Sequence, residues 1–247
     1  MRRRTDSTPS IVGRTLTAVL FDLDNTLIDR DTALGRFLAK RLPPPLVEKA
    51  LALGTLPRDS THNRRRLYHD LCAEFPSEFD PSHFSESDLL DGIVAEIQPD
   101  PRVRATLTDL ARTYRLGLVT NGGSMTQRRK LAAAELAGFF EVITISAEAG
   151  CEKPEPRIFL ETLAALGVHA DAALFVGDDP VRDIDGARAA GLRACWVART
   201  ALTHPTADLQ IASVTELRSL LALPTNADNY GRARSTCQPS SNPTTST

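Results

Sequence analysis

The chain has 247 residues, a formal net charge of −2 and a pI near 6.2, and 42% of its residues are hydrophobic. This length is enough for one buried core, with or without an inserted second domain. The balanced charge gives no support to binding of a nucleic acid polymer or a membrane surface. No apolar run approaches the roughly 20 residues that a membrane span requires.

The two ends of the chain differ in composition from its middle. Residues 1–13 are basic and then polar, without a hydrophobic signal region. Residues 225–247 consist largely of Ser, Thr, Asn and Pro. We predict a disordered leader and a disordered tail. The four cysteines have no paired close spacing, which indicates neither a zinc site nor a disulfide framework and favours a cytoplasmic location.

Short apolar runs alternate with helical patterns along the chain. Runs without polar alternation are typical of strands that are buried in a parallel sheet. Their alternation with helices predicts an α/β fold, a Rossmann-like parallel sheet with helices on both faces. The predicted strands are 18–21, 116–119, 142–145, 173–176 and 194–197, and the predicted helices are 103–112, 126–136, 157–166 and 183–190.

The first and second predicted strands are separated by more residues than one crossover helix needs. We therefore predict an all-helical cap over 30–98, inserted between the core segments 14–29 and 99–224. A cap at the carboxyl end of the first strand would exclude water and select substrates. Its predicted helices are 32–41, 46–53 after a stop at Pro43–Pro45, 63–75, and 87–97 with a start at Ser87.

The first predicted strand ends on Asp22 and Asp24. Side chains two residues apart on a strand point to the same face. Two such carboxylates oppose each other's ionisation unless a cation lies between them or one holds a proton. Asn25 and Thr26 favour a turn, so the pair lies where open parallel sheets bind ligands. The alternative interpretation is an acidic loop that caps a helix.

The second predicted strand ends on Thr120, followed by Asn121, Gly122 and Gly123 and by a helix that begins near Ser124. Glycines let backbone amides approach an anion closely. A helix N-terminus also favours negative charge. The pattern indicates a phosphate-binding loop, and the alternative is an ordinary strand–turn–helix connection with a capping serine.

Lys153 is one of four lysines in the chain and follows the third predicted strand. Pro154 disfavours helical backbone at Lys153 and keeps it extended. An ammonium group held in this way suits a phosphoryl group. The alternative is a solvated lysine in a loop.

The fourth predicted strand also ends on acidic residues, with Asp178, Asp179 and Asp183 in close succession. With Asp22 they would form a cluster of hard oxygen ligands, the type that Mg²⁺ prefers. So many carboxylates at one sheet edge would destabilise the fold if no metal bound there. We therefore predict a magnesium site.

These four segments, in this order and at these strand ends, resemble the haloacid dehalogenase superfamily of hydrolases over about residues 16–222. The insert is similar to the cap of the subgroup that includes phosphoglycolate phosphatase and β-phosphoglucomutase. The loops around 120–122 and 146–154 look most like those of nucleotidases and sugar-phosphate phosphatases. The matching residues are Asp22, Asp24, Thr26, Thr120, Lys153, Gly177, Asp178 and Asp183.

The resemblance implies a role for each residue in catalysis. Asp22 would be the nucleophile that forms an aspartyl-phosphate. Asp24 would protonate the leaving oxygen and then deprotonate the attacking water. Thr120, Asn121 and Lys153 would hold the substrate phosphate.

The resemblance also implies a metal site. Mg²⁺ would bind the carboxylates of Asp22 and Asp178 and the backbone carbonyl of Asp24. Asp179 and Asp183 would orient a metal-bound water or the nearby lysine. A neutral Asp24 would then lie beside an ionised, metal-bound Asp22.

The implied function is a Mg²⁺-dependent phosphatase that acts on a small phosphomonoester, such as a sugar phosphate, a nucleotide or phosphoglycolate. Dehalogenating members lack a carboxylate at the position of Asp24, so that activity is disfavoured. The alternatives are a phosphomutase similar to β-phosphoglucomutase and a non-catalytic binding protein of the same fold. The Arg64–Arg66 run does not identify the substrate, and both a monomer and a homodimer stay open.

Overall fold

The computed structural model of the chain describes residues 15–55, 63–198 and 203–221. The predicted leader and tail lie outside the described residues. The described part contains a six-stranded parallel sheet in the order β3-β2-β1-β4-β5-β6. The strands are β1 (Ala18–Phe21), β2 (Arg115–Thr120), β3 (Val142–Ile145), β4 (Ala173–Gly177), β5 (Arg193–Val197) and β6 (Leu209–Ile211).

The α/β fold class predicted from the sequence is confirmed, and five of the six strands match the predicted ones closely. The sequence does not predict β6, because this edge strand is three residues long and its central Gln210 is exposed. A strand this short gives no run of apolar residues to detect.

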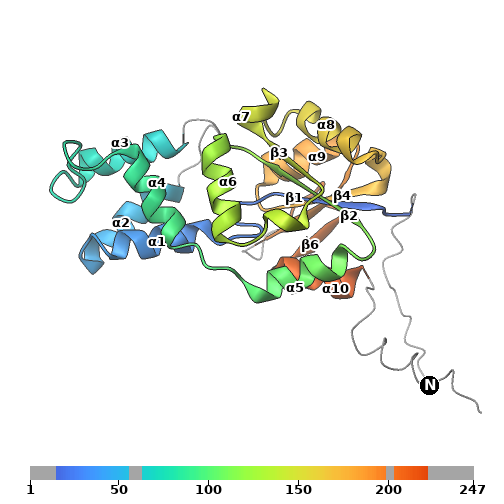
Figure 1. Ribbon diagram of the computed structural model, residues 1–247, viewed down its shortest axis with the longest axis horizontal. Coiled ribbons are helices and arrows are strands. Elements are labelled where there is room, and N and C mark those ends of the chain that lie inside the picture. The colour runs from blue at the N-terminus through green and yellow to red at the C-terminus, as the bar shows by residue number, and fades with distance from the viewer. Residues whose placement is uncertain (1–14, 56–62, 199–202, 222–247) are drawn as a thin grey trace, which may run out of the picture.

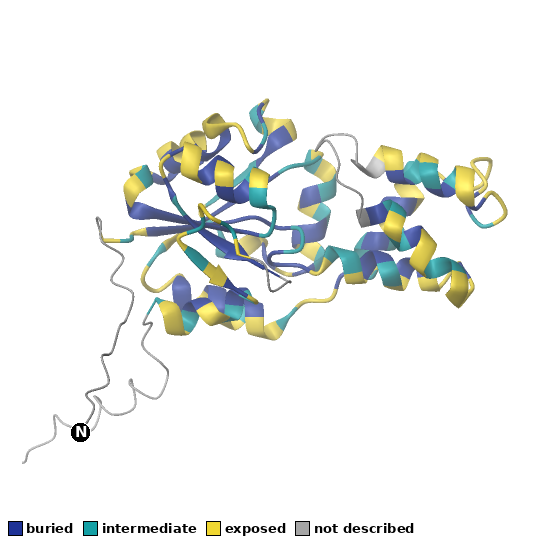
Figure 2. Ribbon diagram, turned by 180° about the vertical axis from the view of Figure 1, so that it is seen from behind, coloured by how far each residue is buried: buried dark blue, intermediate teal, exposed yellow. Residues whose placement is uncertain are grey.

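The strand β1 is buried on both faces of the sheet. Ala18 and Leu20 belong to one apolar cluster, and Val19 and Phe21 to another, because successive side chains on a strand point to opposite faces. The first cluster is covered by α8 (Pro156–Leu166) and α9 (Gly186–Ala189), and the second by α5 (Pro101–Leu110), α6 (Ser124–Ala133) and α10 (Leu217–Leu220). Figure 1 shows helices on both sides of the sheet, and in Figure 2 the central strands β1 and β4 are dark blue.

The helix predicted at 183–190 differs from the observed structure. A π-helical turn, η3, covers Pro180–Asp185, and the short helix α9 follows it. The segment begins early because the Asp179 side chain accepts hydrogen bonds from the backbone N–H groups of Val181 and Arg182. Pro180 suits the first position of the turn, because its fixed φ matches the turn and an N–H group at that position would have no partner within it.

Five described helices lie between β1 and β2, and the first four of them gather beyond one end of the sheet (Figure 1). The division of the chain into a core and a cap at 30–98 stays a prediction. Two predicted helix starts were wrong. The helix predicted at 46–53 begins at Pro44, and Ser85, not Ser87, caps the last helix in a capping box with Asp88. These four helices are α1 (Arg30–Ala39), α2 (Pro44–Thr55), α3 (Asn63–Glu74) and α4 (Glu86–Ala95).

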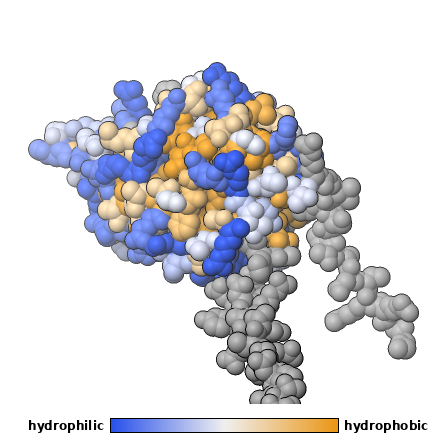
Figure 3. Space-filling model, turned by 45° about the vertical axis from the view of Figure 1, so that its right-hand side comes forward, coloured by the Kyte–Doolittle hydropathy of each residue, from blue (hydrophilic) through white to orange (hydrophobic). Residues whose placement is uncertain are grey.

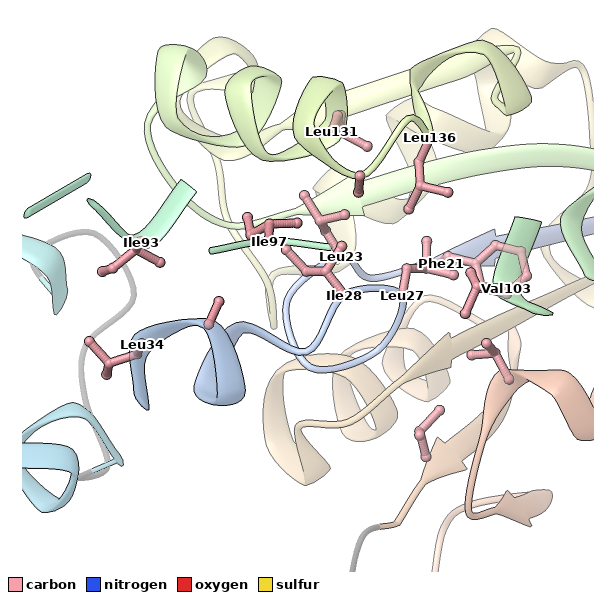
Figure 4. Close-up of a cluster of buried hydrophobic side chains, with 14 of the residues drawn as sticks. Phe21, Leu23, Leu27, Ile28, Leu34, Ile93, Ile97, Val103, Leu131 and Leu136 are labelled. Atoms are coloured by element: carbon pink, nitrogen blue, oxygen red, sulfur yellow. The ribbon is translucent and has the colours of Figure 1, made fainter. Parts of the chain in front are cut away.

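The loop after β1 is held by apolar side chains that connect the four helices to the sheet. Leu23, Leu27 and Ile28 are each at most 5% exposed. They lie in the same cluster as Ile97, at the end of the inserted segment, and Leu131 on α6 (Figure 4). This packing fixes the backbone that carries Asp22 and Asp24.

The described surface offers few large apolar side chains. Met125, Leu160, Val181 and Leu220 are exposed, and each belongs to a different element. In Figure 3, hydrophobic residues are interspersed with hydrophilic ones on the face that is turned forward. Among the described helices, none combines the length and apolar character needed to cross a membrane.

The contact between α1 and α4 predicts the effect of a glycine substitution. A Cβ atom added to Gly92 would lie 2.0 Å from Cε2 of Phe37, whose ring also packs near Phe79 and Phe84. Because this ring has little room to move, we expect Gly92→Ala to lower the free energy of unfolding by about 1–3 kcal/mol. Urea denaturation followed by circular dichroism measures this change.

The matched control is Gly138→Ala, because a Cβ atom there meets nothing within 4 Å. We expect the control to change the free energy of unfolding by less than about 0.5 kcal/mol. Equal denaturation midpoints for the two variants would show that the α1–α4 contact does not limit stability.

Candidate active site

The sequence-predicted acidic residues lie at the carboxyl ends of the central strands. Asp22 follows β1 and Asp178 follows β4, while Thr120 ends β2. The strand order reverses between β1 and β4, and such a switch point is where open α/β sheets bind ligands.

The ammonium group of Lys153 lies between two buried carboxylates. Its Nζ atom is 2.6 Å from Oδ1 of Asp22 and 2.6 Å from Oδ1 of Asp183. Lys153 is 3% exposed, Asp22 6% and Asp183 1%. Burying these charges is tolerable only because they are paired, so Lys153 is a structural part of the site and not a solvated loop lysine.

Asn121 holds the backbone of Lys153. Its Nδ2 atom donates to the Lys153 carbonyl and its Oδ1 atom accepts from the Lys153 N–H, each at 2.9 Å. The peptide bond between Lys153 and Pro154 is cis. The predicted contact of Asn121 with a substrate phosphate stays a prediction, because in this structure the side-chain amide positions the lysine.

Asp22, Asp178 and Asp183 form an acidic cluster, with one carboxylate oxygen of each within 4.8 Å of the others. Thr26 Oγ1 donates to Asp178 at 3.4 Å. Asp179 instead caps its own turn and pairs with Arg182 at 2.9 Å. Asp183, rather than Asp179, therefore lies nearer to the group of carboxylates that is able to bind a cation.

Asp183 packs directly over the end of β4. A Cβ atom added to Gly177 would lie 2.4 Å from Cγ of Asp183. A glycine before Asp178 thus leaves the space that lets the third carboxylate join the cluster.

The loop conformation separates Asp24 from Asp22. Asn25 has φ of 61°, in the left-handed region that asparagine tolerates better than most residues. The Leu27 and Ile28 N–H groups both donate to the Leu23 carbonyl, closing a tight turn. The carboxylates of Asp22 and Asp24 consequently have different partners.

Asp24 is bound by two residues of α6 that the sequence analysis did not assign to the site. Lys130 Nζ lies 2.8 Å from Oδ1 and 2.7 Å from Oδ2 of Asp24. Gln127 Nε2 donates to Oδ2 of Asp24 at 3.0 Å and to Thr120 Oγ1 at 2.5 Å. The sequence held one signal for these two site residues. Gln127 and Lys130 are polar residues three apart, and so lie on one side of a predicted helix, and Lys130 is one of only four lysines.

The arginine run on α3 does not join this group. The side chains of Arg65 and Arg66 are exposed, and Arg66 pairs with Asp70 at 3.8 Å. The side chain of Arg64 lies outside the described residues. A solvent-facing helix surface explains the described part of the run.

The carboxyl groups of the site also differ in the direction of their pKa shifts. Burial raises the pKa of Asp22 to about 7, against the opposing attraction of Lys153. Burial and the negative charges of Asp22 and Asp183 raise the pKa of Asp178 to about 8. Burial is thus the main cause of both shifts, and repulsion among three carboxylates that share one lysine adds to it.

Asp24 has the opposite shift. Burial raises its pKa, but the Lys130 ammonium, the Arg30 guanidinium and the hydrogen bonds from Lys130 and Gln127 outweigh burial and hold the pKa below its ordinary value. The resemblance implies a neutral Asp24 beside a metal-bound, ionised Asp22, and this division stays a prediction. Among the residues themselves, the cations face Asp24 and the other carboxylates face Asp22.

Two relatives match parts of the chain. A phosphoserine phosphatase from Thermus thermophilus is 46% identical over 100 residues, and the match covers 40% of this chain and 40% of that relative. A glyceraldehyde 3-phosphate phosphatase from Methanopyrus kandleri is 32% identical over 195 residues, covering 74% of this chain and 84% of the relative.

Two solved structures share the fold over most of this chain. A HAD phosphatase from Thermococcus onnurineus has a TM-score of 0.64 and 29% identity, covering 83% of this chain and 98% of that one. A 2-haloacid dehalogenase from Pseudomonas syringae has a TM-score of 0.55 and 28% identity, covering 84% and 99%.

The family model described as "haloacid dehalogenase-like hydrolase" matches residues 16–191, a range that includes every acidic strand-end residue described above. The chain therefore belongs to the haloacid dehalogenase-like hydrolases. Because a phosphatase matches it over most of its length, the chain is one of the phosphomonoester hydrolases in that family.

The raised pKa values predict a pH dependence of stability. With pKa values near 7 and 8 in the fold and 3.8 ordinarily, Asp22 and Asp178 hold more protons in the folded than in the unfolded chain between about pH 4 and 8. The free energy of unfolding should fall as pH rises through this window. Thermal unfolding in EDTA from pH 5 to 8.5 measures the change.

The control for this dependence is the double variant Asp22→Asn, Asp178→Asn, which lacks both ionisable groups and should have a flatter profile between pH 5 and 8.5. A melting temperature that rises with pH in the EDTA-treated wild-type protein would contradict the prediction.

Proposed function

We propose that the protein is a Mg²⁺-dependent phosphatase that hydrolyses a small phosphomonoester through an aspartyl-phosphate on Asp22. The observation that carries this proposal is the grouping of Asp22, Lys153, Asp178 and Asp183 at the carboxyl ends of β1 and β4, with Asp24 two residues after Asp22. The grouping provides a nucleophile, a cation for the phosphoryl group and a second carboxyl group for proton transfer.

The donor set fits a magnesium ion. Three carboxylates within 4.8 Å of one another supply hard oxygen ligands, which Mg²⁺ prefers. Burial and, to a smaller extent, the neighbouring carboxylates raise the pKa values of Asp22 and Asp178, and a divalent cation would offset the negative charge of these groups. Asp22, Asp178 and the Asp24 backbone carbonyl would hold the ion, while Asp183 keeps Lys153 in place. When bound, Mg²⁺ offsets negative charge on the phosphoryl oxygens and on Asp22.

The residues of the chain divide the chemistry between them. An oxygen of Asp22 attacks phosphorus while the bond to the leaving oxygen breaks, and Asp24 gives that oxygen a proton. Water then attacks the aspartyl-phosphate, gives a proton to Asp24 and releases phosphate. Lys153 and the Thr120 hydroxyl hold the phosphoryl oxygens, whose charge they offset in the transition state.

The substrate class is a small phosphate monoester. The two curated relatives described above are named for phosphoserine and for glyceraldehyde 3-phosphate, so a panel must contain both. Sugar phosphates, nucleotides and phosphoglycolate complete it, because the helical insert and the loops at 120–122 and 146–154 resemble those of enzymes that act on such compounds.

The first test of the proposal is release of inorganic phosphate from this panel with Mg²⁺ and with EDTA. We expect release from at least one compound, lost in EDTA and restored by excess Mg²⁺, because the carboxylates otherwise repel a phosphate. Release that is equal in EDTA would refute the metal dependence. Conversion to an isomeric phosphosugar would indicate a mutase, and no release with bound Mg²⁺ would favour a binding protein.

A second test replaces the nucleophile. Asp22→Asn should lower kcat by at least about 10³-fold, because the amide cannot attack phosphorus. The variant should stay folded in EDTA at pH 8, because it removes a negative charge from a cluster that already has an excess. Phosphate release and thermal unfolding measure the two outcomes.

The matched control for this substitution is Asp80→Asn, an exposed aspartate in the loop after α3. Its kcat should stay within about twofold of the wild-type value because surface substitutions away from a site have small effects. Full activity of Asp22→Asn would eliminate the proposed covalent mechanism.

A further inference from the structure

The helix α6 carries four consecutive polar residues, Gln127 to Lys130, that contact different parts of the molecule. Arg128 and Arg129 point outward, where they pair with Glu148 and Asp91. Gln127 is 1% exposed and Lys130 7%, and both face inward, because residues three apart lie on the same side of a helix. Gln127 and Lys130 both donate hydrogen bonds to Asp24, which lies more than 100 residues earlier in the sequence.

The contacts fix both oxygens of the Asp24 carboxylate. Lys130 Nζ donates to Oδ1 and Oδ2, and Gln127 Nε2 donates to Oδ2. Gln127 also donates to the Thr120 hydroxyl. A carboxylate with three such contacts has little freedom to rotate about its Cβ–Cγ bond.

Stability alone does not account for a buried lysine at this position. Removing an ammonium group from water costs several kcal/mol, and a well-packed apolar side chain often serves stability as well or better than a buried ion pair. Both hydrogen bonds of the Lys130 ammonium go to Asp24, and the turn at Asn25 already separates that carboxylate from Asp22. A role in the reaction explains the burial of Lys130 better than a role in stability does.

We propose that Lys130, assisted by Gln127, is a positioning residue that holds the Asp24 carboxyl group in the orientation from which it exchanges a proton with the leaving oxygen. The proposal rests on the proposed function, in which Asp24 moves that proton. When Asp24 carries a proton on one oxygen, the other oxygen still accepts from Lys130. The orientation is therefore kept in both the acid and the base form.

The proposal distinguishes substrates by their leaving group. When the bond from phosphorus to the leaving oxygen breaks, the electron pair stays on that oxygen. An alkyl oxygen is strongly basic and needs the proton from Asp24, whereas a nitrophenolate oxygen is stable without it. Misplacing Asp24 should therefore harm hydrolysis of alkyl phosphates more than hydrolysis of p-nitrophenyl phosphate.

The test compares kcat/KM for both kinds of substrate, using the best alkyl phosphate from the panel. Lys130→Met keeps the length of the side chain and removes its charge. We expect kcat/KM to fall by about 10²–10³-fold for the alkyl phosphate and by less than about tenfold for p-nitrophenyl phosphate. Lys130→Arg should recover part of the loss, because guanidinium N–H groups also donate to a carboxylate.

Two further variants keep the test decisive. Gln127→Met removes the other donor to Asp24 and should show the same preference with a smaller loss, about tenfold for the alkyl phosphate. This variant replaces Lys130→Met if the latter does not fold. Lys49→Met is the matched control, because it removes a lysine from an exposed ion pair with Glu74 on the helical insert, and it should leave both rates unchanged.

The outcomes separate this proposal from the one on which it rests. Wild-type protein without metal-dependent phosphatase activity would overturn the proposed function and the role of Lys130 with it. An active wild-type protein whose Lys130 and Gln127 variants lose activity equally on both substrates would overturn the positioning role alone, since general loss of structure affects both. Unchanged activity in both variants would also overturn it.

Discussion

The pairing of Lys153 with Asp22 and Asp183 is the interaction on which the site depends. A parallel sheet brings the carboxyl ends of β1 and β4 side by side, and the acidic residues that follow these strands are then forced together in a buried place. One lysine 2.6 Å from two of them makes the arrangement tolerable, but does not offset the whole charge. Three carboxylates against one ammonium group leave negative charge in excess, which suits a site for a divalent cation.

Two aspartates two residues apart have opposite environments because the chain turns after β1. Asp22 lies among other carboxylates, and Asp24 lies against Lys130 and Gln127. Their pKa values consequently shift in opposite directions, which is how neighbouring carboxyl groups acquire different chemical tasks. The left-handed turn residue Asn25 makes this division possible.

The apolar packing around the first loop connects the site to the helical insert. Leu23 and Leu27 alternate along the chain with the polar site residues and lie in one buried cluster with Ile97 and Leu131 (Figure 4). The helix α6 belongs to this cluster and also supplies the two donors to Asp24. The packing of α6 therefore also sets the position of the Asp24 carboxylate, and a shift of α6 would move the two donors to Asp24.

The sequence by itself determined the fold class, five of the six strands, and the acidic and basic residues that follow them, because apolar runs, turn residues and strand-end charges are local signals. It did not determine the partners of those residues. Only the tertiary structure decided that Asn121 holds the backbone of Lys153, that Asp183 rather than Asp179 joins the acidic cluster, and that Lys130 binds Asp24. Contacts between residues so far apart in sequence leave no local pattern, since they exist only once the sheet order and the position of α6 are set.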